Sequence, residues 1–126
     1  DEVMELEELR AAAIKFLDNG GGSGEDKCDY CKGVRDPKSS DNPDKAIISL
    51  KNERETTYAT YISVQNELVA AYTSLRNKRA EELFGISYTE MQKNYKDVNW
   101  PGSKLKLKEN ITQIKLEYPQ KLSEVQ

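Results

Sequence analysis

The sequence predicts an all-α protein: a long-helix antiparallel hairpin or a small bundle of three to four helices, with an N-terminal amphipathic helix packed on it. Three observations support this prediction. Apolar residues recur at three- and four-residue steps over most of the chain, and helix start and stop signals bound these stretches. Charged residues make up 33% of the chain and hydrophobic residues 37%, a balance typical of amphipathic helices around a thin core.

Residues 1–19 are predicted to form an amphipathic helix that ends at Asn19-Gly20. Residues 1–18 hold six acidic and two basic side chains, a net charge of −4, so the remainder carries +1 of the total of −3. An acidic helix beside a slightly basic body is typical of a ligand and its receptor. The apolar stripe of this helix consists of Val3, Leu6, Leu9, Ala13, Phe16 and Leu17.

Residues 20–24 read Gly-Gly-Gly-Ser-Gly, which is the composition of a flexible spacer. We interpret them as an artificial tether, so that residues 1–19 would be a fused helical ligand; a natural glycine hinge is the alternative. Residues 25–126 would then be a helical interaction domain that opens with a polar, cysteine-containing loop over 25–42.

A long helix is predicted over 43–84, because Asn42-Pro43 fits an N-cap followed by a first-turn proline and Gly85 fits a C-cap. Its heptad-like seam includes Gln65, and a polar residue on a seam often fixes register or binds a specific partner. The seam and its flanks supply one wall of a groove: Tyr58, Tyr61, Ile62, Gln65, Leu68, Val69, Tyr72 and Leu75.

A short helix is predicted over 87–98, because Ser87 and Glu90 fit a capping box. A C-terminal helix follows over 103–126, kinked or broken near Pro119. It would run antiparallel to the long helix, and the N-terminal helix would lie in the groove between them. The second wall of the groove is predicted from the helical spacing of Leu107, Ile111, Ile114 and Tyr118.

The composition argues against several classes of function. The chain contains no His, which is the commonest general base and metal ligand, and no nucleophile–base pair can be nominated. We therefore expect no enzyme activity and no small-molecule substrate. The net charge of −3 argues against generic nucleic-acid binding, and no apolar run is long enough for a membrane span. We expect an intracellular protein, cytoplasmic or nuclear.

Cys28 and Cys31 form a C-x-x-C motif with three interpretations. A thioredoxin-like redox pair would need a preceding strand, and none is predicted. Zinc needs four ligands, so either two chains would each supply two thiolates, or the pair would be the second half of a finger whose first half lies outside this sequence. The third interpretation, which we favour, is that both cysteines are free or form a small local disulfide. No cofactor is expected, with zinc as the one alternative.

The leading hypothesis is a non-catalytic protein–protein interaction or scaffold module whose partner supplies an amphipathic helix. Two alternatives remain open: a zinc-linked structural dimer through the C-x-x-C motif, and an adaptor fragment whose long helix forms an intermolecular coiled coil, so a homodimer is also considered. Basic residues at 76, 78 and 79 and at 104, 106 and 108 could form a phosphate-binding patch, although ordinary solvated helix faces are the favoured interpretation.

Overall fold

The computed structural model describes residues 6–51 and 57–125, which form four α-helices and one short pair of strands. The helices are α1 (Leu6–Leu17), α2 (Tyr58–Phe84), α3 (Tyr88–Lys96) and α4 (Lys104–Glu117). The strands are β1 (Ile48–Lys51) and β2 (Leu122–Val125), and a single 3-10 turn, η1, spans Gly24–Asp26. The predicted all-α fold class is confirmed, because α1 packs on α2, α2 on α3 and α3 on α4.

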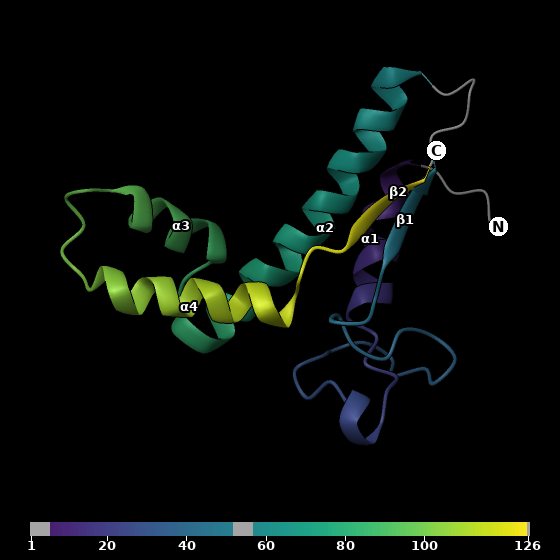
Figure 1. Cartoon of the computed structure of the whole chain (residues 1–126), viewed down its shortest axis with the longest axis horizontal. Helices are drawn as coiled ribbons and strands as arrows, with labels where there is room; N and C mark the ends of the chain where they lie inside the picture. Colours follow the sequence, from purple (N-terminus) through teal and green to yellow (C-terminus); the bar gives the residue numbers. More distant parts are fainter. Residues whose placement is uncertain (1–5, 52–56, 126) are drawn as a thin grey trace.

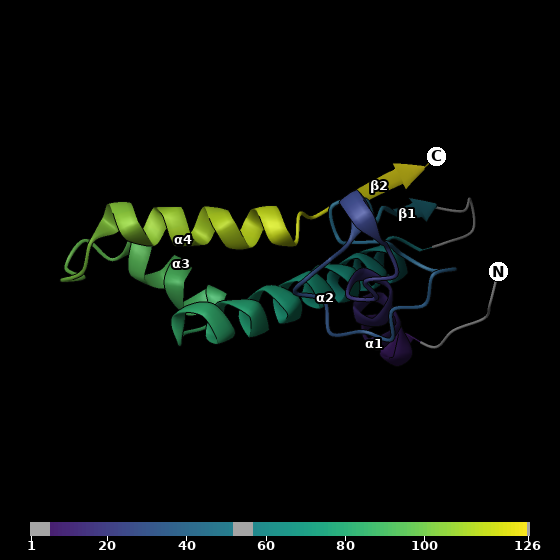
Figure 2. The same ribbon diagram turned by 90° about the horizontal axis from the view of Figure 1, so that it is seen from below.

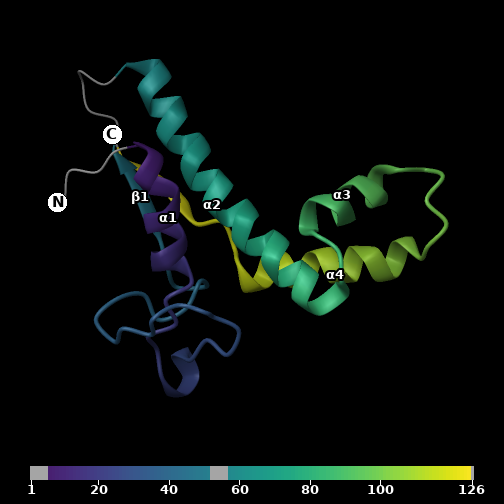
Figure 3. The same cartoon turned by 180° about the vertical axis from the view of Figure 1, so that it is seen from behind.

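The molecule is elongated, and α2 connects its two ends (Figure 1). One end contains α1, the two strands and the loop that carries η1, while the other end contains α3 and α4 (Figure 2). Seen from behind, α1 lies beside the N-terminal half of α2 (Figure 3). The turn between α3 and α4 is the extremity farthest from the strands.

Three apolar clusters form the core, and α2 contributes to each of them. The first joins α1 to the N-terminal half of α2 through Ala13, Leu68 and Ala71. The second joins the end of α1 to α2 and to the residue after α4, through Leu17, Ala46, Tyr72, Leu75 and Tyr118. The third joins α2, α3 and α4 through Ala80, Tyr88, Met91, Leu107, Ile111 and Ile114.

Local capping signals define several helix ends. The hydroxyl of Thr57 accepts a hydrogen bond from the amide of Thr60 at 3.1 Å and begins α2. Gly85 ends α2 with a φ of 78°, a left-handed conformation that favours glycine. Ser87 caps α3 and Ser103 caps α4, each accepting from the amide three residues further on.

The predicted start of the long helix at Pro43 is wrong. Asn42 does accept a hydrogen bond from the amide of Lys45, at 3.1 Å, but this closes a turn and no helix follows it. The chain continues as β1, and α2 begins only at Tyr58. The β-branched residues Ile47 and Ile48 favour extended backbone, and β1 finds a strand to pair with at the other end of the chain.

The predicted C-terminal helix over 103–126 is also too long. α4 ends at Glu117, and the break falls at Pro119, which has no amide hydrogen to continue the helix. Residues after the break form β2, which pairs in parallel with β1 in the register Ile48↔Leu122. The hydroxyl of Tyr72 accepts a hydrogen bond from the amide of Lys121 at 3.2 Å and thereby anchors this strand to α2.

Candidate protein-binding site

α1 occupies one side of the predicted groove. Leu17 is fully buried and Ala13 nearly so, while Leu9 and Phe16 pack partly buried against the same clusters. The residues opposite them are Leu68, Ala71, Tyr72, Leu75 and Tyr118. The structure thus brings together most of the predicted ligand face and part of the predicted groove. α1 begins at Leu6, and Val3 lies outside the described residues.

The remaining groove residues lie elsewhere. Leu107, Ile111 and Ile114 pack in a cluster with residues of α3 and the end of α2, and this cluster contains no residue of α1. On α2, Tyr58 is 79% exposed, so the seam opens toward solvent at its first turn. Tyr61 packs against the Ala13 cluster, while Ile62, Gln65 and Val69 are half-buried on α2.

A buried polar contact holds the end of α1 in place. The hydroxyl of Tyr118 donates to Asp18 Oδ1 at 2.6 Å, and the amide of Lys32 donates to Asp18 Oδ2 at 3.1 Å. Asp18 is only 7% exposed, so both partners are needed to offset the cost of burying its carboxylate. Burial, followed by the hydrogen bond to Asp18, raises the pKa of Tyr118 well above its usual value.

The segment predicted as a flexible spacer is an ordered, hydrogen-bonded turn. Its amides donate to the loop beside it, from Gly21 to the carbonyl of Ser40 at 2.9 Å and from Gly22 to that of Asp41 at 3.2 Å. A Cβ at Gly21 would lie 2.1 Å from the carbonyl oxygen of Asp36, so only glycine fits there. A random-coil tether would need none of these contacts, so the flexibility expected from composition is corrected.

Asn19 is the centre of this turn and is 1% exposed. Its Nδ2 donates to the carbonyls of Asp36 at 2.9 Å and Ser40 at 2.8 Å, and its Oδ1 accepts from the amide of Asp36 at 3.1 Å. The side chain therefore satisfies backbone groups of a loop that has no regular structure of its own. Asn19, which the sequence predicts only as a helix-ending residue, therefore also holds this loop in place through three hydrogen bonds.

Cys28 and Cys31 form a disulfide, which is one of the arrangements that the sequence left open. Both cysteines are buried, at 1% and 3% exposure. Arg35, with a positive φ of 57°, donates to the carbonyls of Cys28 at 2.9 Å and Cys31 at 2.8 Å. While the disulfide is intact, neither sulfur is a thiolate that could bind zinc, and the described residues contain no group of three or more possible ligands.

The cysteine loop reaches α4 through Tyr30. Its hydroxyl donates to the carbonyl of Glu117 at 2.5 Å, and its ring meets that of Tyr118 edge-on, with centroids 5.3 Å apart. Arg79 lies over the Tyr30 ring at 5.1 Å and donates to Glu117 Oε1 at 2.5 Å. Burial, followed by the nearby charge of Glu117, raises the pKa of Tyr30 to about 12.

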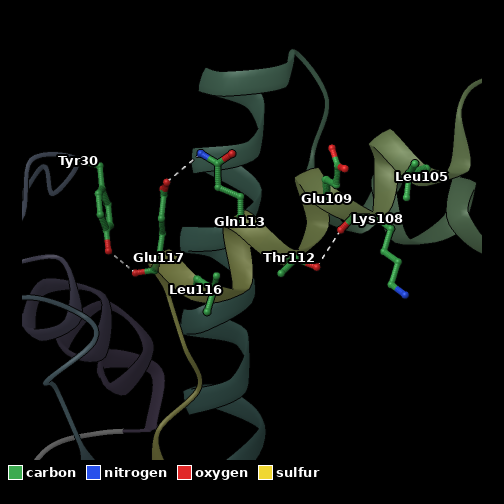
Figure 4. Close-up of a pocket in the computed structure, with 8 residues that line it drawn as sticks. All are labelled: Tyr30, Leu105, Lys108, Glu109, Thr112, Gln113, Leu116 and Glu117. Atoms are coloured by element: carbon green, nitrogen blue, oxygen red, sulfur yellow. Dashed lines mark hydrogen bonds between the residues drawn. The ribbon is translucent and has the colours of Figure 1, made fainter.

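The face of α4 that points away from the core carries a hollow of about 600 Å³ (Figure 4). Leu105 and Leu116 lie along it and are 71% and 70% exposed, and Tyr30 closes one end. Polar side chains line the rest of the hollow: Lys108, Glu109, Thr112, Gln113 and Glu117. The amide of Gln113 donates to Glu117 Oε2 at 3.1 Å, which holds part of this lining in place.

The sequence prediction did not include Tyr30, Leu105 or Leu116. The missed signal is that Leu105 and Leu116 are eleven residues apart, about three helical turns, and so share a face that the core stripe does not use. Tyr30, in a polar loop, gave no signal of its contact with α4.

The two basic clusters do not meet. Arg76 donates to the carbonyl of Tyr118 at 3.0 Å and Arg79 pairs with Glu117, both at the C-terminal end of α4. Lys104, at the opposite end of α4, donates to backbone carbonyls that end α3. Arg76 and Arg79 are therefore half-buried structural contacts, in place of the ordinary solvated helix face that the sequence favoured.

The chain matches no protein-family model, and no curated protein or solved structure is significantly similar to it. Within residues 6–51 and 57–125, no helix is both long enough and apolar enough to cross a membrane.

Proposed function

We propose that the chain is a non-catalytic protein-interaction module that binds a short amphipathic segment of another protein on the outer face of α4. The observation that carries this proposal is the pair of exposed leucines, Leu105 and Leu116, on either side of the α4 hollow. Apolar side chains exposed together beside a concave surface are typical of protein-binding sites.

The spacing of the two leucines defines the ligand. Eleven residues of helix place them about 16 Å apart, so a helical segment of about three turns can contact both. An apolar side chain at each end of such a segment would meet one leucine, as in helix-in-groove recognition. Lys108 and Glu109 offer one charge of each sign near the middle, so the ligand needs polar groups there rather than a strong net charge.

The proposal assigns α1 a different role from that of a bound ligand. Leu17 of α1 and the next two residues, Asp18 and Asn19, are buried among residues from other parts of the chain, and the link to the body is a packed turn. We therefore treat α1 as the third apolar surface that closes the core, which leaves the α4 face as the surface for a partner.

The Cys28–Cys31 disulfide is relevant to the cellular compartment of the protein. Disulfides persist in oxidising compartments and are rare in the cytosol and nucleus. The buried pair therefore supports an extracytoplasmic location in place of the intracellular one expected from the sequence.

The test is a selection of displayed helical peptides against the intact protein. Peptides that bind are expected to carry apolar residues at helical spacing. Their affinity is expected to fall by about tenfold or more for Leu116→Glu, because a charge replaces apolar surface at the contact. Val34→Glu is the matched control, since Val34 is 69% exposed and lies beside α1, outside the lining of the α4 hollow. If binding is equal for both variants, or if no peptides are enriched, the proposal is wrong.

A further inference from the structure

The turn between α3 and α4 is a protrusion that carries exposed apolar side chains. Val98 is 90% exposed, the highest value among the exposed large hydrophobic residues, and Tyr95 is 41% exposed. In the figures this turn is the extremity of the molecule that lies farthest from α1 and the strands (Figures 1 and 2). An apolar residue at a convex end cannot be covered by a neighbouring element of the same chain.

Several hydrogen bonds hold the protrusion in shape. The side chain of Asp97 accepts from the amide of Asn99 at 2.9 Å, and its carbonyl accepts from the amide of Trp100 at 3.2 Å. Lys104 Nζ donates to the same carbonyl at 2.5 Å and to that of Tyr95 at 2.6 Å. Val98 is therefore held outward by a defined turn, and presenting it to a binding partner costs little conformational entropy.

The turn and the helix ends beside it are basic. Residues 93–108 contain five lysines and one aspartate, a net charge of +4, so the rest of the chain must carry −7 to give the total of −3. Four of these lysines are exposed, and no ion pair joins them to another described residue: Lys93, Lys96, Lys106 and Lys108. The turn and the helix ends beside it thus carry a local excess of positive charge, which favours contact with an anionic surface.

We propose that the α3–α4 turn is a peripheral membrane contact that inserts Val98 and Tyr95 among anionic lipid headgroups, with the surrounding lysines bound to the phosphates. This site shares Lys108 with the lining of the α4 hollow, but its apolar residues are different and it does not rest on the proposed protein-binding function. Apolar residues at a convex tip, flanked by long lysine side chains that can bend toward the headgroups, suit a lipid interface. A nucleic acid or an acidic protein would use the charge but would leave Val98 without a role.

The chain contains an intrinsic fluorescent probe close to this proposed contact. Trp100 is the only tryptophan, and its ring lies against Gly102 in the same turn. Energy transfer from Trp100 to vesicles that contain a dansyl-labelled lipid therefore reports docking of this end of the molecule. The intact protein is titrated with vesicles of phosphatidylcholine alone and with anionic vesicles that also contain about 30% phosphatidylglycerol.

Binding is expected only with the anionic vesicles, and it should be lost in about 1 M salt because the screening length falls to about 3 Å. Lys93→Gln combined with Lys96→Gln should weaken binding by roughly 30-fold, since each lysine near an anionic surface contributes about fivefold. The control with the same change in charge combines Lys15→Gln with Lys38→Gln, two exposed lysines at the other end of the molecule, and should bind as the parent does.

The apolar contribution is tested with Val98→Asp, which should weaken vesicle binding by about tenfold or more. Val34→Asp is its control, since Val34 is also well exposed, at 69%, and should have little effect. Circular dichroism confirms that each variant folds. The proposal is overturned if anionic vesicles do not bind, if Val98→Asp binds as tightly as Val34→Asp, or if a single-stranded oligonucleotide or polyglutamate binds this end while vesicles do not.

Discussion

Replacing Leu17 with alanine tests whether α1 is an integral part of the fold. Leu17 is 0% exposed and packs against Ala46, Tyr72, Leu75 and Tyr118. Removing its terminal carbons leaves a cavity among side chains from several elements that cannot easily collapse. Substitutions of this kind cost about 3 kcal/mol. For a chain of this length, that corresponds to a fall in Tm of roughly 10 °C.

Urea unfolding of Leu17→Ala should be followed by two probes at once. Far-ultraviolet circular dichroism reports all the helices, whereas the fluorescence of Trp100 reports the end of the molecule that lies far from α1. If α1 is integral, both probes should shift together to lower urea, because the domain unfolds as one cooperative unit. Leu116→Ala is the matched control: the same substitution at a residue that is 70% exposed should cost less than about 0.5 kcal/mol.

Two results would refute this reasoning. Equal stabilities of Leu17→Ala and Leu116→Ala would mean that burial of Leu17 contributes nothing. A circular-dichroism transition that moves while the Trp100 transition stays in place would mean that α1 detaches from a body that is stable without it. The second result would restore the interpretation of α1 as a tethered ligand.

Two further predictions concern the turn after α1 and Tyr30 in the cysteine loop. Gly21→Ala should lower the free energy of unfolding by about 1–3 kcal/mol, because its Cβ would meet the carbonyl of Asp36. The control is Ser23→Ala at an exposed position, which should change the free energy of unfolding by less than about 0.5 kcal/mol. Equal values for the two variants in urea unfolding would contradict the packed turn. The pKa of Tyr30 is raised from 10.0 to about 12, so its contribution to stability is present in full below pH 10 and is lost as the pH rises toward 12. Stability measured from pH 8 to 12 should therefore fall less steeply for Tyr30→Phe, and equal slopes would refute the prediction.

The parts of the fold that depend on local signals could be predicted from the sequence. Ser87, Gly85 and Ser103 mark helix ends because a cap needs only a few neighbouring residues. The apolar stripe of α1 and the seam of α2 also meet as expected, since each follows from helical periodicity within one segment.

The parts that depend on distant partners could not be predicted in this way. Residues 48–51 become a strand because 122–125 lie alongside them, and no pattern within either segment indicates the other. The glycine run has the composition of a spacer, and only the carbonyls of Asp36 and Ser40 nearby show that it is packed. Helical periodicity identifies the core face of α4, and Leu105 and Leu116 lie on another face. A binding face consists of apolar residues that the core does not use, so the core stripe does not reveal it.

The hydrogen bond between Asp18 and Tyr118 joins residues that are 100 positions apart. At about 5–20 residues per second, Asp18 is synthesised roughly 5–20 s before Tyr118. Through that interval the apolar side of α1 lacks Tyr118 as well, because this one residue supplies both the hydroxyl for Asp18 and part of the surface around Leu17. The core around α1 can therefore be completed only after Tyr118 has been synthesised, and a chain truncated before Tyr118 would leave the apolar side of Leu17 partly uncovered.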